Sequence, residues 1–202
     1  MSRDDGRPGA GRRTTLLIGI VIGVFIPPLA ALAVAATGWL DMSATRPPGP
    51  VERLVGGMLA DRSVERRAPD TRNPLPASPE VLAAGLEHYR ENCVICHGAP
   101  GVPPGEAGKG LNPPAPDLAR RGPQGSSDGE LFQVIGHGIR MTGMPGWLPT
   151  HSEREIWEIV RFVRHLPALT ASEREALAGG EAGEHHEGSE HHDEDAARSS
   201  PR

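Results

Sequence analysis

Two cysteines and one histidine form the run of this chain best suited to chemistry. Cys93 and Cys96 are separated by two residues, His97 follows directly, and these are the only cysteines in the sequence. In a Cys-x-x-Cys-His run, the two thiols can form thioethers with the vinyl groups of one haem, and the histidine can offer a ring nitrogen to the iron. The run should therefore end one helix and turn once, so that both sulfurs reach one edge of the macrocycle.

Three other interpretations of the cysteine pair have to be weighed. A Cys-x-x-Cys pair can be a redox couple, but that requires a βαβ context, which the surrounding sequence does not show. It can be half of a zinc site, which requires two more ligands at suitable spacing. It can also be a plain disulfide. The added histidine favours haem, so we predict one covalent haem c as the cofactor.

The composition fits a small domain built around a large apolar group. The 202 residues include 26 glycines and 21 prolines, and aromatic residues make up only 3%. A small core with so few rings is marginal alone, and a covalent haem would supply the missing apolar volume. The net charge of −5 matches the seven acids and two arginines of residues 179–202, so the rest of the chain balances. Without a basic patch interleaved with aromatics, we expect no nucleic-acid partner.

An apolar run near the N-terminus predicts a transmembrane helix. Residues 14–36 carry no charge and are long enough to span a bilayer core as a helix. Arginines precede the run, which predicts cytoplasmic residues 1–13, a signal-anchor over 14–40 and export of everything after it. The alternative is a signal peptide cleaved at Ala33-Val34-Ala35, but the run exceeds the usual apolar length of a signal. Both alternatives deliver Cys93 and Cys96 outside the cytoplasm.

Residues 41–77 are predicted to be a linker with proline-rich ends and a possible short helix between them. The helix is indicated by apolar residues at i, i+3, i+4, i+7 and i+8, which share one face: Val51, Leu54, Val55, Met58 and Leu59. This pattern fits equally a helix on the membrane, a helix against a partner helix, and a segment packed on the haem domain.

Residues 78–178 are predicted to form an all-α haem domain. Ser78-Pro79-Glu80 is an N-terminal helix signature, and the helix that it opens leads into Cys93. Capping boxes at Ser127-x-x-Glu130 and Ser152-x-x-Glu155 open two further helices. A short helix is expected over residues 171–178.

A loop rich in proline and glycine, residues 98–125, separates the haem motif from the second helix. A loop of this length normally has a function, and we expect it to wrap the haem edge on the side of His97. A proline carbonyl in this loop, for example that of Pro113 or Pro114, is expected to accept a hydrogen bond from the free ring nitrogen of His97 and so fix its tautomer. The sequence does not say which proline of the loop supplies it.

The sixth position of the iron has three candidate ligands. Met144 is preferred, because it lies between a glycine and a proline in stiff, extended chain and far enough beyond His97 to return across the opposite haem face. Met141 and His137 are the rivals. Met141 would otherwise fill a gap in the core, and His137 would otherwise be a polar residue at a helix end.

The acidic C-terminal tail, residues 179–202, is predicted to be disordered. It contains two histidine pairs that form a candidate site for a divalent metal such as zinc, copper or nickel: His185, His186, His191 and His192. The alternative is a solvated tail that keeps the protein soluble.

Taken in order, these motifs resemble a class I, mono-haem bacterial cytochrome c. The resemblance covers residues 78–167 and is carried by Gly85-x-x-x-Tyr89-x-x-x-Cys93-x-x-Cys96-His97, by Met144-Pro145 and by the last amphipathic helix. It implies a small all-α fold around one haem, in which the first and last helices cross beside it. In that fold Gly85 would let the last helix approach closely, and Tyr89, Trp157 or Phe162 would pack there.

The expected function is that of a membrane-tethered electron carrier. The resemblance and the apolar run together place the haem domain in the periplasm, on the bacterial inner membrane, with redox protein partners of a respiratory or dehydrogenase complex. Axial ligation by His97 and Met144 would favour electron transfer. The chain shows no base, nucleophile or cofactor loop that would make it an enzyme alone. A haem sensor or peroxidase, which needs an open sixth position, is the alternative.

Overall fold

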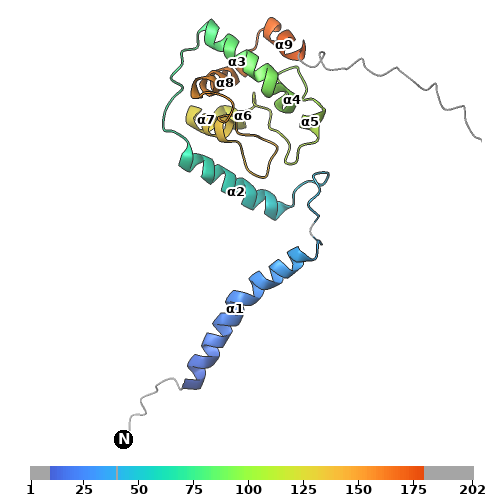
Figure 1. The fold of residues 1–202 in the computed structure, drawn as a ribbon, viewed down its shortest axis with the longest axis vertical. Coiled ribbons are helices and arrows are strands. Elements are labelled where there is room, and N and C mark those ends of the chain that lie inside the picture. Colours follow the sequence, from blue (N-terminus) through green and yellow to red (C-terminus); the bar gives the residue numbers. More distant parts are fainter. Residues whose placement is uncertain (1–9, 40, 180–202) are drawn as a thin grey trace, which may run out of the picture. The chain divides into compact units, whose positions relative to one another are not determined.

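The computed structural model describes residues 10–39 and 41–179, which fold almost entirely into helices (Figure 1). Within these residues there is no strand, only an isolated bridge between Ala99 and Val102. The prediction of an all-α fold with one apolar helix at its N-terminal end is confirmed. The chain divides into two compact units, one ending at Ser43 and the other starting at Ala44.

The first unit is built on helix α1, Ala10–Ala36. Its stretch Thr14–Ala36, 23 residues, is long and apolar enough to cross a membrane by length and composition. The large apolar side chains of this stretch are exposed along its whole length. An exposed apolar surface of this extent is uncommon in a soluble protein and agrees with the predicted anchor.

In the second unit the linker contains a longer helix than the sequence indicated. Helix α2, Pro50–Arg67, begins with proline in its first turn, and the Glu52 carboxylate accepts a hydrogen bond from the Gly49 N–H at 3.3 Å. It contacts helix α7, Asp128–His137, of the haem domain. Just before α2, the Asn112 side chain donates a hydrogen bond to the Arg46 carbonyl, which ties this end of the linker to the loop after the haem motif.

The haem domain is organised by the crossing of α3, Pro79–Asn92, and α8, Glu153–His165 (Figure 1). The two backbones meet at Gly85, where an added Cβ would lie 2.4 Å from the Glu158 carbonyl oxygen and 2.7 Å from the Phe162 Cβ. Only glycine permits this approach, as the resemblance implied for Gly85.

Aromatic rings fill the space on either side of the crossing. Tyr89 and Phe162 are fully buried with ring centroids 5.4 Å apart, whereas Trp157 stacks on Phe132 of α7 at 4.4 Å. The largest fully buried side chains also include several aliphatic residues: Ile156, Ile159, Leu166, Leu177, Val160 and Val163. Most of the core therefore comes from α8 and the segment that follows it.

The remaining helices are short. Both predicted capping boxes are formed, with the Ser127 and Ser152 side chains accepting from backbone N–H groups, and α9, Ala171–Ala178, has a third at Thr170. Helix α4, Val94–His97, is a single turn, and Leu166–Ala168 form a 3-10 turn. Two helices inside the proline-rich loop were not predicted: α5, Glu106–Lys109, and α6, Arg121–Gly125. Neither is long enough to show a helical period.

A polar network holds the segment before α3 onto α7 and α8. The Asp128 carboxylate accepts from the Asn73 backbone N–H at 2.9 Å and from Arg164 Nε at 2.8 Å. The Asn73 side chain donates to the Trp157 carbonyl at 2.7 Å, and Arg161 donates to the Asn73 and Leu75 carbonyls. Backbone and side-chain groups of residues 73–75 thus both bind this segment to the haem domain.

This network sets the ionisation of its carboxylate. Burial alone would raise the pKa of Asp128, but the hydrogen bonds from Asn73 and Arg164 and the charges of Arg164 and Arg161 outweigh burial and lower it. The charged form of Asp128 therefore stabilises the folded domain.

Adding one methyl group at the helix crossing should destabilise the domain. Gly85→Ala places a Cβ against backbone that cannot move without separating α3 from α8, and overpacking of this kind costs about 1–3 kcal/mol. The free energy of unfolding of the holoprotein in denaturant measures the effect. Gly122→Ala, where nothing lies within 4 Å of the new Cβ, is the matched control and should not destabilise the domain, because Gly→Ala at an unstrained position stabilises by about 0.4–1 kcal/mol.

Removing the charge of Asp128 should make the domain less stable and less sensitive to acid. At pH 7, Asp128→Asn should cost about 1–3 kcal/mol, because it weakens hydrogen bonds to a charged group. Because folding lowers the pKa of Asp128, its contribution is complete above the unfolded value of about 3.9 and is lost as the pH falls through the lower folded value. Denaturant unfolding at a series of pH values should show the two proteins converging in acid. A difference in the free energy of unfolding between wild type and Asp128→Asn that persists in acid would contradict the assignment. An equal loss of stability in the exposed control Asp70→Asn would contradict it as well.

Candidate functional site

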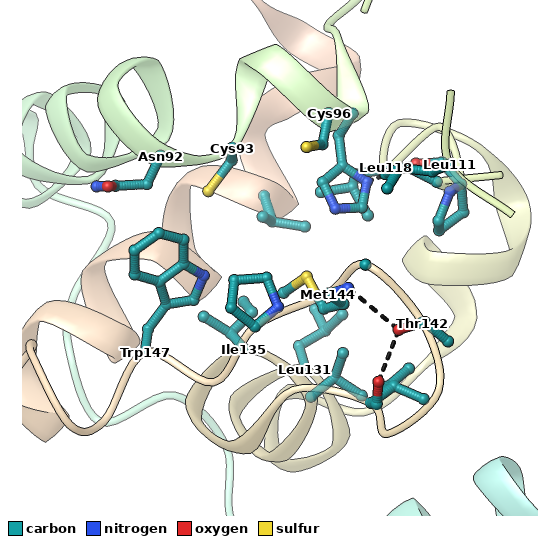
Figure 2. Close-up of a pocket in the computed structure, with 18 of the residues that line it drawn as sticks. Asn92, Cys93, Cys96, Leu111, Leu118, Leu131, Ile135, Thr142, Met144 and Trp147 are labelled. Carbon is teal, nitrogen blue, oxygen red and sulfur yellow. Dashed lines mark hydrogen bonds between the residues drawn. The ribbon is translucent and has the colours of Figure 1, made fainter. Parts of the chain in front are cut away.

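The sequence motif lies on the wall of a cavity inside the haem domain. The cavity has about 1020 Å³ of empty volume, part of it open to solvent, and lies between α4, α7, α8 and two loops. Its lining is almost wholly apolar and includes Leu111, Pro113, Pro114, Leu118, Leu131, Val134, Ile135, Ile139, Pro145, Trp147, Ile159 and Val163. Figure 2 shows Cys93 and Cys96 on one side of this space and Met144 on the other.

The backbone turns at the motif in the manner predicted. Cys93 caps the C-terminal end of α3, with its N–H donating to the Tyr89 carbonyl at 2.9 Å. The His97 N–H then donates to the Cys93 carbonyl, also at 2.9 Å, which closes the single turn of α4. This turn brings the two sulfurs and the His97 ring to the same cavity.

The state of the thiols bears on the alternative interpretations. Both cysteines are free, so they form no disulfide with each other. Burial, together with the nearby Cys96 thiol, raises the pKa of Cys93 to about 12, whereas reactive redox cysteines have lowered values. Within residues 10–39 and 41–179, no group of three or more His, Cys, Asp and Glu side chains could hold a metal ion. The zinc and redox interpretations therefore gain no support.

The His97 ring is oriented by a backbone carbonyl. His97 Nδ1 lies 2.8 Å from the Pro116 oxygen, and because a carbonyl only accepts, Nδ1 carries the proton and the Nε2 lone pair is left available. Burial lowers the pKa of His97, and the Pro116 contact offsets this only in part, so the neutral ring is favoured. A proline carbonyl was predicted, but Pro113 and Pro114 were the wrong residues; they line the cavity instead.

Two glycines let the proline-rich loop press against the haem motif. An added Cβ on Gly108 would lie 2.7 Å from the carbonyl oxygens of both Ile95 and Cys96. At Gly98, directly after the motif, φ is +62° and a Cβ would lie 2.5 Å from the Val102 oxygen. Glycine is required at both positions, because any side chain would push the loop away from the cavity.

Met144 is held by a tight turn after α7. Its N–H donates to the Thr142 hydroxyl at 3.1 Å, the hydroxyl donates to the Ile139 carbonyl at 2.7 Å, and the Ile139 N–H donates back to the Met144 carbonyl at 3.2 Å (Figure 2). Gly143 lies against Leu111 of the proline-rich loop, where an added Cβ would be 2.3 Å from the leucine Cδ2. The turn therefore places Met144 in the wall of the cavity, and through Gly143 it contacts the proline-rich loop.

The other candidate ligands lie elsewhere. Met141 is 79% exposed and is not part of the cavity lining, and its φ of +63° turns the chain there. His137 is exposed at the end of α7 and also does not line the cavity. The tail histidines His185, His186, His191 and His192 lie outside the residues that the structure describes.

These residues fit a covalently attached haem. The apolar lining suits a porphyrin, the two thiols lie along one wall, and the oriented ring of His97 is beside them. Met144 faces them across the cavity (Figure 2). A buried, almost wholly apolar cavity containing these four side chains is poorly suited to a hydrated ligand.

The all-α fold and this site together define a c-type cytochrome domain. Residues 80–163 match the family model of cytochrome C oxidase, cbb3-type, subunit III, so this part of the chain is a c-type cytochrome domain, which implies covalently bound haem c. The matched range runs from the first turn of α3 almost to the end of α8. No curated protein matches the chain.

Several residues that shape the site could not be found from the sequence. Pro116 is one of many prolines in its loop, and only the folded backbone shows which carbonyl faces His97. Thr142 is separated from Met144 by a single residue, as in many Ser/Thr turns, and this spacing is a usable but weak signal. Trp147 and Leu111 carry no signal beyond being apolar.

The Thr142 hydroxyl should be necessary for a rigid Met144 turn. Thr142→Val keeps the shape of the side chain but removes a hydrogen bond worth about 1 kcal/mol, so the Met144 amide hydrogen should exchange about fivefold faster. Amide exchange in the holoprotein followed by NMR measures this. Thr150→Val removes a hydroxyl that donates to the Trp147 carbonyl, at a residue that does not line the cavity, and should leave the Met144 amide unchanged. An unchanged rate in Thr142→Val would show that the hydroxyl is dispensable.

Proposed function

We propose that this protein is a membrane-tethered electron carrier whose single haem c has histidine and methionine as axial ligands. The observation that carries the proposal is the placement of Met144 opposite Cys93 and Cys96 across an apolar cavity (Figure 2). Haem c supplies a one-electron couple, and a thioether on its iron favours electron transfer over the binding of small ligands.

Each residue of the site has one task in this proposal. Cys93 and Cys96 hold the group through thioethers, and His97 offers Nε2 to the iron while the Pro116 carbonyl holds Nδ1–H. Met144 fills the sixth position, and the apolar walls exclude water from it. A filled sixth position is unfavourable for peroxidase or sensor chemistry, and on this proposal the protein is not an enzyme by itself.

The tether and the setting are inferred from α1 and from the family match. The exposed apolar stretch Thr14–Ala36 fits a retained anchor, and the arginines before it favour an orientation with the haem domain on the periplasmic face. The matched family is named for a subunit of cytochrome C oxidase. By analogy, the partners are redox proteins in or on the same membrane, within a respiratory or dehydrogenase complex.

The absorption spectrum of the oxidised protein tests the ligand assignment. Ferric haem with sulfur bound has a weak far-red band, and Met144→Ala should abolish it. The same change should lower the reduction potential by on the order of 0.1 V or more, a fraction of the roughly 0.8 V that axial ligands control. Met141→Ala, which removes an exposed methionine three residues away, is the matched control and should keep both properties. A wild-type spectrum without the band would mean an open or nitrogen-bound sixth position and would end the proposal.

The tail supports a second, separate proposal. His185-His186 and His191-His192 are two imidazole pairs in an acidic run, and such pairs bind zinc, copper or nickel. Titration of the full-length holoprotein with each metal should show micromolar binding that is lost when all four histidines are replaced by alanine. Binding that survives the replacement would place the metal elsewhere, and no binding at all would leave the tail as a solvated segment.

A further inference from the structure

Helix α2 turns its apolar side away from the protein. Five large apolar residues of this helix are 43% to 73% exposed: Val51, Leu54, Val55, Met58 and Leu59. All of α2 is described, and none of its residues is buried. Large apolar side chains gathered on one exposed helical face indicate a contact that the isolated chain does not make.

The contact with α7 is made by the opposite side of the helix. Ala60 and Val64 are the only half-buried residues of α2, and at 3.6 residues per turn they lie opposite Val51 and Val55, at the centre of the apolar face. Helix α2 runs along the outside of α7 (Figure 1). To pack its apolar face on the haem domain, α2 would have to rotate by about half a turn about its own axis. In the observed orientation this face is therefore free to contact another surface.

The chain itself keeps this face near a membrane. Arg46 is bonded to Asn112 of the haem domain, so at most nine residues, 37–45, connect the end of α1 to that domain. Nine extended residues span at most about 30 Å. If α1 is a membrane anchor, as proposed above, α2 can never move far from the lipid headgroups.

The charges beside the apolar face suit lipid rather than a buried protein interface. Arg62 and Arg66 continue the same face by one and two turns, together with Asp61 and Glu65. Arg62 pairs with Glu65 at 2.9 Å, but both side chains are exposed, at 78% and 51%, so the pair is weak. Over the whole helix, four arginines stand against Glu52, Asp61 and Glu65. Apolar side chains followed by long, exposed charged side chains suit a helix that lies in the headgroup region of a membrane.

We propose that α2 is an interfacial helix that lies on the membrane surface and holds the haem domain at a fixed orientation above it. The apolar face enters the headgroup region, and the face with Ala60 and Val64 carries α7. Because α7 supplies Leu131, Val134 and Ile135 to the cavity wall, the orientation of α2 sets the orientation of the haem site. The inference rests on the proposed anchor, and its test separates the two.

Spin labels on introduced cysteines can test this in the full-length holoprotein. Haem attachment consumes both native thiols on the proposal above, so a new cysteine is the sole label site. Leu54→Cys reports the apolar face, Ser63→Cys is the matched control on an exposed side of the same helix, and Val21→Cys reports the anchor. The protein is placed in nanodiscs of phosphatidylcholine and phosphatidylglycerol, and a sample under nitrogen without nickel gives the baseline that contains the relaxation caused by the haem iron.

The measurement is the collision rate of each label with oxygen, which enters lipid, and with a water-soluble nickel chelate. The labels at positions 54 and 21 should favour oxygen severalfold, and the label at position 63 should favour nickel. Introducing Met58→Glu beside the Leu54→Cys label should reverse its preference, whereas Ser63→Glu should not.

Each other outcome overturns a specific claim. If the label at position 21 favours oxygen but the label at position 54 favours nickel, the anchor stands and the interfacial helix is wrong. If the label at position 21 favours nickel, the anchor itself is wrong. A label at position 54 that is shielded from both reagents would indicate a protein contact, with a second copy of the chain as its source in these nanodiscs, and would also overturn the lipid assignment.

Discussion

The site depends on a backbone contact that leaves no room for a side chain. Gly85 lies against the Glu158 carbonyl and Phe162, and this approach fixes the crossing of α3 and α8. The C-terminal end of α3 carries Cys93, and α8 supplies Ile159 and Val163 to the cavity. The crossing therefore sets the distance between Cys93 and the wall of the cavity that α8 forms. These two crossed helices are the frame on which the rest of the cavity is assembled. Close packing makes such a frame stiff, since a well-packed core has no spare volume in which helices can shift.

The frame explains why a chain so rich in proline and glycine can form a defined pocket. Proline restricts the backbone of the long loop, and glycine at positions 98 and 108 lets that loop lie against the haem motif. The hydrogen bond from His97 to Pro116 ties the loop to the motif a second time. Order in this region comes from a few backbone contacts with the frame rather than from regular secondary structure, which is why the loop needs no apolar periodicity of its own.

Features that depend on neighbouring residues could be predicted from the sequence, whereas contacts between segments far apart in the chain could not. The N-cap at Ser78, the capping boxes at Ser127 and Ser152 and the haem motif depend on residues within one or two turns, and all were predictable. The Pro116 carbonyl and the rotation of α2 could not be derived, because each depends on how segments far apart in the chain are brought together. The apolar spacing in residues 51–59 indicated a helix, but it could not tell which of its sides would meet the domain.

The network around Asn73 also has a consequence for where the domain begins. The family match starts at residue 80 and α3 at Pro79, yet residues 73–75 are bonded to Asp128, Trp157 and Arg161. An added Cβ on Gly129 would lie 1.9 Å from the Pro69 carbonyl oxygen, which shows how closely the preceding residues lie against α7. A fragment cut at the family boundary would leave Asp128, Trp157 and Arg161 without these partners. The unit that folds is therefore longer than the unit that is matched, and its upstream edge lies at or before Pro69.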